Sequence, residues 1–177
     1  MKKTNKFNRI SHLTLSLLLM ITMVANLSAA VKVGAPAPDF KMMDQDGKPH
    51  TLADYKGQKV VVYFYPKDDT PGCTKEACSI RDDYGKFEES GVTVLGVSYD
   101  SPESHKAFAE KYMLPFTLLT DADKSASEAY GTKGLFYTSR KTFLIDEKGI
   151  LKKIYENVDV TTHGSDILAD FEALAKD

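Results

Sequence analysis

Two runs of apolar, β-branched and aromatic residues predict buried strands in the first half of the chain. One covers residues 59–65 and ends at Pro66, and the other covers residues 92–98. Continuous apolar runs of this length, without alternating polar positions, are typical of central strands that are buried on both faces of a sheet. We therefore expect a sheet with helices on both of its sides.

Apolar residues spaced three or four positions apart predict helices between and after these strands. The longest helix is expected over 72–90, and others over 102–113, 124–130 and 166–176. Ser101 supplies an N-cap for the helix expected over 102–113. Pro102 then suits its first helical position, because that position needs no N–H donor.

Shorter strands complete the pattern. An Asp46-Gly47 turn predicts an N-terminal hairpin, and a second hairpin turns at Gly149. The order is hairpin, three alternating strands and helices, second hairpin and terminal helix. This order is typical of an α/β protein of the thioredoxin-like class, with a mixed central sheet flanked by helices. The short strands are expected at 40–43, 50–52, 116–119, 140–146 and 150–155.

The first thirty residues have the composition of a secretory signal. Four basic residues precede an apolar run at 13–24, and small residues follow at Ser28 and Ala30. The run is short and interrupted for a membrane span. We expect residues 1–30 to be a cleaved signal peptide, with export to a bacterial periplasm and no membrane association after cleavage. An uncleaved N-terminal anchor is the alternative.

The remaining residues, 31–177, are sufficient for one domain with a substantial core. Without the four basic residues of the signal, 19 basic residues face 25 acidic ones, a formal charge of −6. A chain of this charge without a basic run is a poor partner for nucleic acid. His50, His105 and His163 are scattered without metal-ligand spacing, so we expect no metal site and ordinary surface or turn histidines.

The two cysteines of the chain, Cys73 and Cys78, carry the main candidate chemistry. Thr70, Pro71 and Gly72 form a helix-start signal, so Cys73 is expected in the first turn. Free backbone N–H groups and the positive end of the helix dipole favour a thiolate there. The Thr70 hydroxyl can reach the same pocket, and Pro66 can shield it from water. Such a thiolate can attack an electrophilic oxygen.

The spacing of the cysteines weighs against a permanent bond between them. Positions i and i+5 of a regular helix have Cα atoms about 8–9 Å apart, beyond the ~7 Å limit for a disulfide. A transient Cys73–Cys78 bond requires the first turns to unwind. A structural disulfide, usual in exported proteins, stays open as an alternative. A thiol-disulfide exchange enzyme is another, although the spacing differs from Cys-x-x-Cys.

Two charged residues are candidates to support the thiolate. Arg140 opens the strand 140–146 and can reach across to the helix start, where a guanidinium would favour the thiolate and bind peroxide oxygen. Glu76, one turn after Cys73, can orient that guanidinium. The alternatives are a solvated arginine at a strand end and a solvent-facing carboxylate.

The pattern Pro66-x3-Thr70-x2-Cys73 resembles the active-site signature of the peroxiredoxins. The longer segment 65–78 and the strand 140–146 are similar to the bacterioferritin comigratory protein, or peroxiredoxin Q, subfamily. The resemblance covers nearly all of 34–177. It implies a thioredoxin fold and reduction of hydrogen peroxide and organic hydroperoxides.

In that resemblance Cys73 would be the peroxidatic cysteine, oxidised to a sulfenic acid. Cys78 would be the resolving cysteine, and Pro66, Thr70 and Arg140 would form the peroxide site. The resemblance further implies no metal or prosthetic group, a thioredoxin-like dithiol reductant and a monomer. An exported enzyme would need an electron donor outside the cytoplasm.

Overall fold

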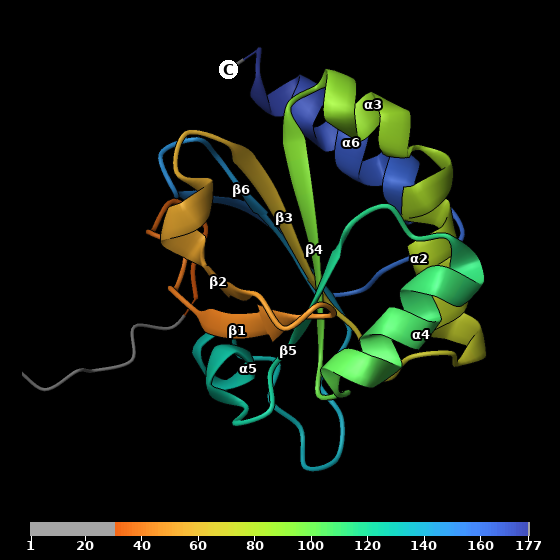
Figure 1. Ribbon diagram of the computed structural model, residues 1–177. Coiled ribbons are helices and arrows are strands. Elements are labelled where there is room, and N and C mark those ends of the chain that lie inside the picture. The colour runs from red at the N-terminus through yellow and green to blue at the C-terminus, as the bar shows by residue number, and fades with distance from the viewer. Residues whose placement is uncertain (1–30, 177) are drawn as a thin grey trace, which may run out of the picture.

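Seven strands form one mixed sheet in the computed structural model, which describes residues 31–176. The strand order is β2-β1-β5-β4-β3-β6-β7 (Figure 1). The thioredoxin-like α/β class expected from the pattern is confirmed. The strands are β1 (Lys41–Asp44), β2 (Pro49–Thr51), β3 (Lys59–Phe64), β4 (Val92–Ser98), β5 (Thr117–Thr120), β6 (Lys141–Ile145) and β7 (Leu151–Tyr155).

The central strand β3 lies between a parallel and an antiparallel neighbour. It pairs in parallel with β4 and antiparallel with β6. Five of its six residues, Val60 to Phe64, are buried, as the continuous apolar run predicts. The two hairpins that flank the parallel part, β1–β2 and β6–β7, are also confirmed.

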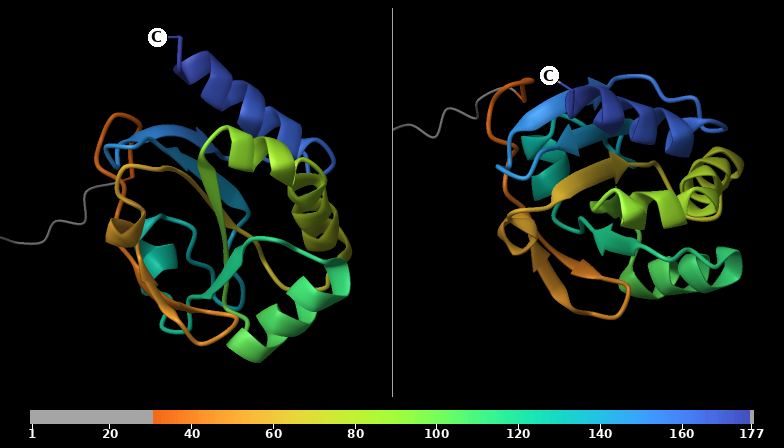
Figure 2. Two further views of the ribbon diagram at one scale, coloured as in Figure 1. Left: turned by 45° about the horizontal axis from the view of Figure 1, so that its top comes forward. Right: turned by 90° about the horizontal axis from the view of Figure 1, so that it is seen from above.

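Helices cover both faces of the sheet. The larger layer contains α2 (Pro71–Asp82), α3 (Tyr84–Glu89), α4 (Pro102–Tyr112) and α6 (His163–Leu174). The opposite face carries α5 (Ser125–Ala129) and a 3-10 turn, η1 (Leu52–Tyr55). Figures 1 and 2 show the two layers from different directions.

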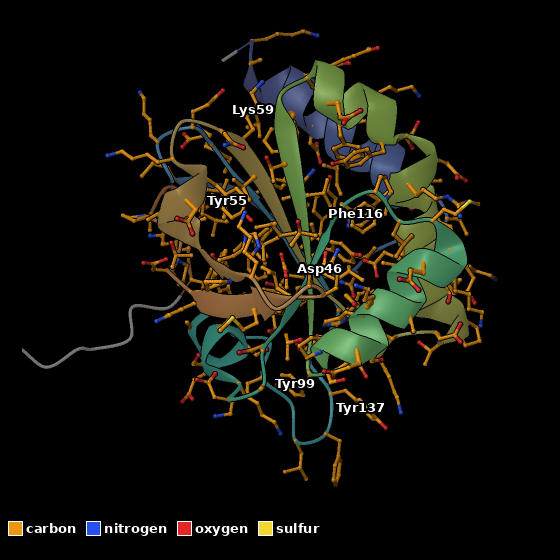
Figure 3. The ribbon with its side chains drawn as sticks, viewed as in Figure 1. Asp46, Tyr55, Lys59, Tyr99, Phe116 and Tyr137 are labelled. Carbon is orange, nitrogen blue, oxygen red and sulfur yellow. The ribbon has the colours of Figure 1, made fainter. Side chains whose placement is uncertain are left out.

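The main core lies between the sheet and the larger helical layer. Phe116, labelled in Figure 3, lies in this core, and its ring meets Tyr63 of β3 edge-on at 6.1 Å. Ile80 of α2, Phe108 of α4 and Ile167 of α6 each place a buried side chain in the same cluster. The sheet and these three helices therefore share one core, which fixes the position of α2.

The prediction of a single helix over 72–90 is wrong. The structure divides it into α2 and α3 at Asp83, whose backbone angles are φ −100° and ψ 7°. Phe87 stays buried on α3, so the apolar spacing continues through the break. The C-terminal helix also begins earlier than expected, at His163.

The start of α6 packs directly against α2. A Cβ atom added at Gly164 would lie 2.4 Å from the Ser79 carbonyl oxygen, so only glycine allows this approach. The Gly164 N–H also points at the Ser79 hydroxyl, 3.4 Å away. This contact fixes the second half of α2 to α6.

The expected signal peptide, residues 1–30, lies outside the described residues. Within residues 31–176, no helix has the length and apolar character needed to cross a membrane.

Candidate active site

The candidate residues gather at the edge of the sheet where the parallel strands β3 and β4 end. The loop that follows β3 leads into α2, and Tyr99, which directly follows β4, lies at this edge in Figure 3. Arg140 enters the same edge because β6 runs antiparallel to β3. Carboxyl ends of parallel strands are a frequent location for binding sites in α/β proteins.

Cys73 lies in the first turn of α2. Thr70 is the N-cap, with extended backbone angles of φ −94° and ψ 151°, and Pro71 takes the first helical position. The first N–H groups of a helix lack partners within the helix and form its positive end. The Cys73 side chain, which is only 2% exposed, is therefore held where a negative sulfur is stabilised.

Arg140 reaches this sulfur from the other side. Its Nη2 atom donates to Cys73 Sγ at 3.2 Å, which joins positions 67 residues apart in the sequence. The side chain is 21% exposed, so the guanidinium is partly shielded from water. A charge-assisted contact of this kind stabilises a thiolate more than a neutral thiol.

Replacing Arg140 by methionine should therefore slow the reaction of Cys73 with iodoacetamide at pH 7. Loss of the guanidinium charge within hydrogen-bond distance leaves a smaller fraction of the sulfur ionised. We therefore expect the alkylation rate to decrease roughly tenfold or more. The measurement is the alkylation rate of Cys73 in the reduced protein across a pH series.

Lys141→Met is the matched control, because Lys141 pairs with Glu156 rather than with the sulfur. The control should keep the parent rate. Equal rates for Arg140→Met and the parent protein would contradict the role given to the guanidinium.

Glu76 is buried rather than solvent-facing. Its side chain has no exposure, and its Oε2 atom accepts a short hydrogen bond from Arg140 Nη1. Burial raises the pKa of Glu76 to about 7, and the neighbouring Arg140 lowers it in part. The same guanidinium thus joins a carboxyl group to the sulfur of Cys73.

Thr70 and Pro66 lie on the loop between β3 and α2. The Thr70 hydroxyl donates to the Lys67 carbonyl oxygen at 3.0 Å, so its proton points into the loop rather than at the sulfur. The hydroxyl oxygen keeps its capacity to accept a bond from an incoming group. Pro66 is half-buried beside this loop.

Cys78 lies on α2, more exposed than Cys73, and both thiols are free. Because α2 is continuous from Pro71 to Asp82, their Cα atoms should lie about 8–9 Å apart, too far for a disulfide. A bond between the two sulfurs requires the helix between them to open.

A buried hydrogen-bond network holds this loop, and sequence reasoning missed it. Asp68 is 6% exposed, and its carboxylate accepts from the Tyr65 and Ser104 hydroxyls at 2.7 and 2.8 Å. His105 Nδ1 lies 3.0 Å from the same carboxylate. Because Asp68 lies between Pro66 and Thr70, the network fixes the loop on which both residues lie.

His105 and His163 are completely buried, so the expectation of surface histidines is wrong for both. A signal was available in the sequence. His105 is spaced three and seven positions from Phe108 and Tyr112, on the apolar face of α4. Within residues 31–176, no group of three or more potential ligands could hold a metal ion.

Comparison with known proteins agrees with the resemblance found in the sequence. The model of the AhpC/TSA family matches residues 33–154. A chloroplastic peroxiredoxin Q from Populus jackii is 51% identical over 132 residues, which cover 73% of this chain and 62% of that protein. A putative peroxiredoxin bcp from Coxiella burnetii is 44% identical over 150 residues, 78% of this chain and 97% of that protein.

A solved structure is also similar. It is the bacterioferritin comigratory protein of Xanthomonas campestris, described for its alkyl peroxide reduction activity. Its TM-score is 0.73 at 32% identity, and the match covers 77% of this chain and 92% of that one.

Proposed function

Because this chain belongs to the AhpC/TSA family, as a peroxiredoxin of the Q or bacterioferritin comigratory type, we propose that it is a thiol-dependent peroxidase whose reactive group is Cys73. Its substrates are hydrogen peroxide and organic hydroperoxides. The observation that carries the proposal is the 3.2 Å contact between Arg140 Nη2 and Cys73 Sγ at the start of α2.

In the first step the Cys73 thiolate attacks one peroxide oxygen. An S–O bond forms, the O–O bond breaks, and the departing oxygen takes up a proton to leave as water or an alcohol. Cys73 becomes a sulfenic acid. Arg140 and the N–H groups at the start of α2 stabilise negative charge on the sulfur and on the departing oxygen. Thr70 supplies a hydroxyl beside this site, and Pro66 shields it.

In the second step the Cys78 thiolate attacks the sulfenic sulfur. The S–S bond forms, and the S–O bond breaks as the departing hydroxide takes up a proton and leaves as water. The step needs the start of α2 to unwind, because the folded helix keeps the two cysteines apart. A thioredoxin-like dithiol protein then reduces the disulfide by exchange and is itself oxidised. The enzyme needs no cofactor and acts as a monomer.

A thiol-disulfide exchange enzyme on the same fold is the alternative. It would have to present its attacking sulfur to a disulfide of another protein. Cys73 is only 2% exposed in the reduced, folded enzyme, which favours a substrate as small as a peroxide. The burial of Cys73 therefore favours the peroxidase.

The test is to mix the reduced protein with one equivalent of hydrogen peroxide and to follow free thiols and intact mass. We expect both thiols to disappear with a mass decrease of about 2 Da, because two hydrogens are lost when the disulfide forms. Thiols that stay unreacted would exclude the peroxidase. Rapid reduction of protein disulfides under the same conditions would then support the exchange enzyme.

Residues 1–30 are proposed to be a signal peptide that directs residues 31–177 to the periplasm. The basic, apolar and small-residue regions of this segment support the proposal. Expression of the full chain in a bacterium, followed by fractionation and N-terminal sequencing, tests it. A periplasmic protein beginning near Val31 is expected, whereas a cytoplasmic protein beginning at Met1 would contradict export.

A further inference from the structure

Behind Arg140 lies a buried side chain that the proposed reaction does not use. His163, the first residue of α6, has no exposure, and its ring meets Tyr155 edge-on at 5.1 Å. Its Nε2 atom lies 2.8 Å from Thr142 Oγ1, whereas Nδ1 has no partner. Burial lowers the pKa of His163 to about 4, so the ring is neutral at pH 7.

Glu76 faces this ring with its second oxygen. Oε2 is occupied by Arg140, but Oε1 is buried without a hydrogen-bond partner and lies 3.9 Å from His163 Nε2. This separation is too long for a hydrogen bond and too short for a water between the atoms. A buried acceptor without a donor is unfavourable. A small side-chain movement that brings the two atoms within hydrogen-bond distance, with one proton bound between them, would satisfy the site.

The surrounding charges favour that proton when Cys73 is ionised. The thiolate and the Glu76 carboxylate then carry two negative charges, and Arg140 supplies one positive charge. The buried hydroxyl of Tyr63 has no hydrogen-bond partner, and its pKa is raised by burial and, to a smaller extent, by the charge of Glu76. One added proton restores neutrality in a region of low dielectric.

His163 has its own charged neighbours. Asp166 on α6 favours its protonated form, whereas Arg140 opposes it. Tyr155 on β7 packs against the ring, but its hydroxyl donates to Asp170. One carboxylate oxygen of Asp166 accepts from the Thr162 hydroxyl. Glu76 Oε1 is the buried, unpartnered oxygen that lies 3.9 Å from the ring nitrogen Nε2.

We propose that Glu76 Oε1 and His163 Nε2 share one proton when Cys73 is a thiolate, and that His163 is thereby a positioning residue for Arg140. The proposal rests on the proposed function only in taking Cys73 as the reactive thiol. With the proton bound, Glu76 is neutralised and the guanidinium charge acts on the sulfur. Without it, the guanidinium charge is divided between the carboxylate and the sulfur.

Thr142 gives the proposal a direction that can be tested. Its hydroxyl occupies the same nitrogen that would take part in the shared proton. Thr142→Val keeps the shape of a β-branched residue and removes this competitor, so the proton should bind more tightly. His163→Phe removes the nitrogen that would share the proton with Glu76 Oε1, so the proton should bind more weakly. A general loosening of the core would instead change the proton affinity of both variants in the same direction.

The experiment measures iodoacetamide alkylation of Cys73 between about pH 5 and pH 9 in reduced protein that also carries Cys78→Ser. We expect an inflection near pH 7 besides that of the sulfur, and Glu76→Gln should remove it. Thr142→Val should move the inflection to higher pH and His163→Phe to lower pH, each by about half a unit or more. His50→Gln, on the remote strand β2, is the control and should leave the profile unchanged.

Superimposable profiles for the parent and Thr142→Val would overturn the proposal, as would movement of both variants in the same direction. If His163→Phe does not fold, Thr142→Val and Glu76→Gln still decide the result. Alkylation needs no peroxide, so failure of this proposal is distinguishable from failure of the peroxidase, which appears as unreacted thiols in the peroxide test.

Discussion

Cys73→Ser is expected to reduce peroxide turnover to the uncatalysed rate. A serine hydroxyl is hardly ionised near pH 7, so neither Arg140 nor the start of α2 can convert it into the nucleophile that the first step needs. Removal of a catalytic nucleophile lowers kcat by on the order of 10⁴-fold or more. The measurement is consumption of hydrogen peroxide by the reduced enzyme in the presence of a dithiol reductant.

The fold of this variant should persist, because serine closely matches the size and shape of cysteine in the buried first turn of α2. Thermal unfolding followed by circular dichroism supplies this control. A folded Cys73→Ser protein that still consumes peroxide at the parent rate would refute the assignment of the nucleophile.

Cys78→Ser is expected to have the second-largest effect, and a different one. The variant should reduce one equivalent of peroxide and then stop, because its sulfenic acid has no neighbouring thiol with which to form a disulfide. We expect a mass increase of about 16 Da, for the added oxygen, in place of the 2 Da decrease of the parent. Turnover supported by a thioredoxin-like protein should fall to near zero after the first equivalent, because no disulfide forms for the dithiol to reduce.

Two measurements separate the roles of the cysteines in this variant. The first equivalent of peroxide should be consumed at the parent rate, since Cys73 and Arg140 are unchanged. Undiminished turnover with the protein reductant would show that Cys73 is resolved by another route.

Much of the fold could be predicted because its signals are local. The apolar runs of β3 and β4 have no polar alternation, and both strands are central in the sheet. The break at Asp83 could not be predicted, since neither proline nor glycine occupies that position and the apolar spacing continues to Phe87. The spacing of apolar residues within one segment therefore does not mark where one helix ends and the next begins.

The site was predictable to a different extent for each residue. The helix-start residues before Cys73 place its sulfur in the first turn of α2, as the structure has it. The contact of Arg140 with Cys73 depends on strand pairing between β3 and β6, so the sequence supports it only as one possibility. The burial of His163 depends on the packing of α6 against α2 and β7, which no local pattern specifies.

The close contact between Gly164 and Ser79 has a consequence for the speed of the catalytic cycle. It lies one residue beyond Cys78, so α2 can unwind from Pro71 to Cys78 while the turn from Ser79 to Asp82 stays attached to α6. Starting a helix is unfavourable, whereas adding residues to an existing turn is not. In the proposed cycle we therefore expect the active site to re-form after each reduction by propagation from this turn, at about nanoseconds per residue.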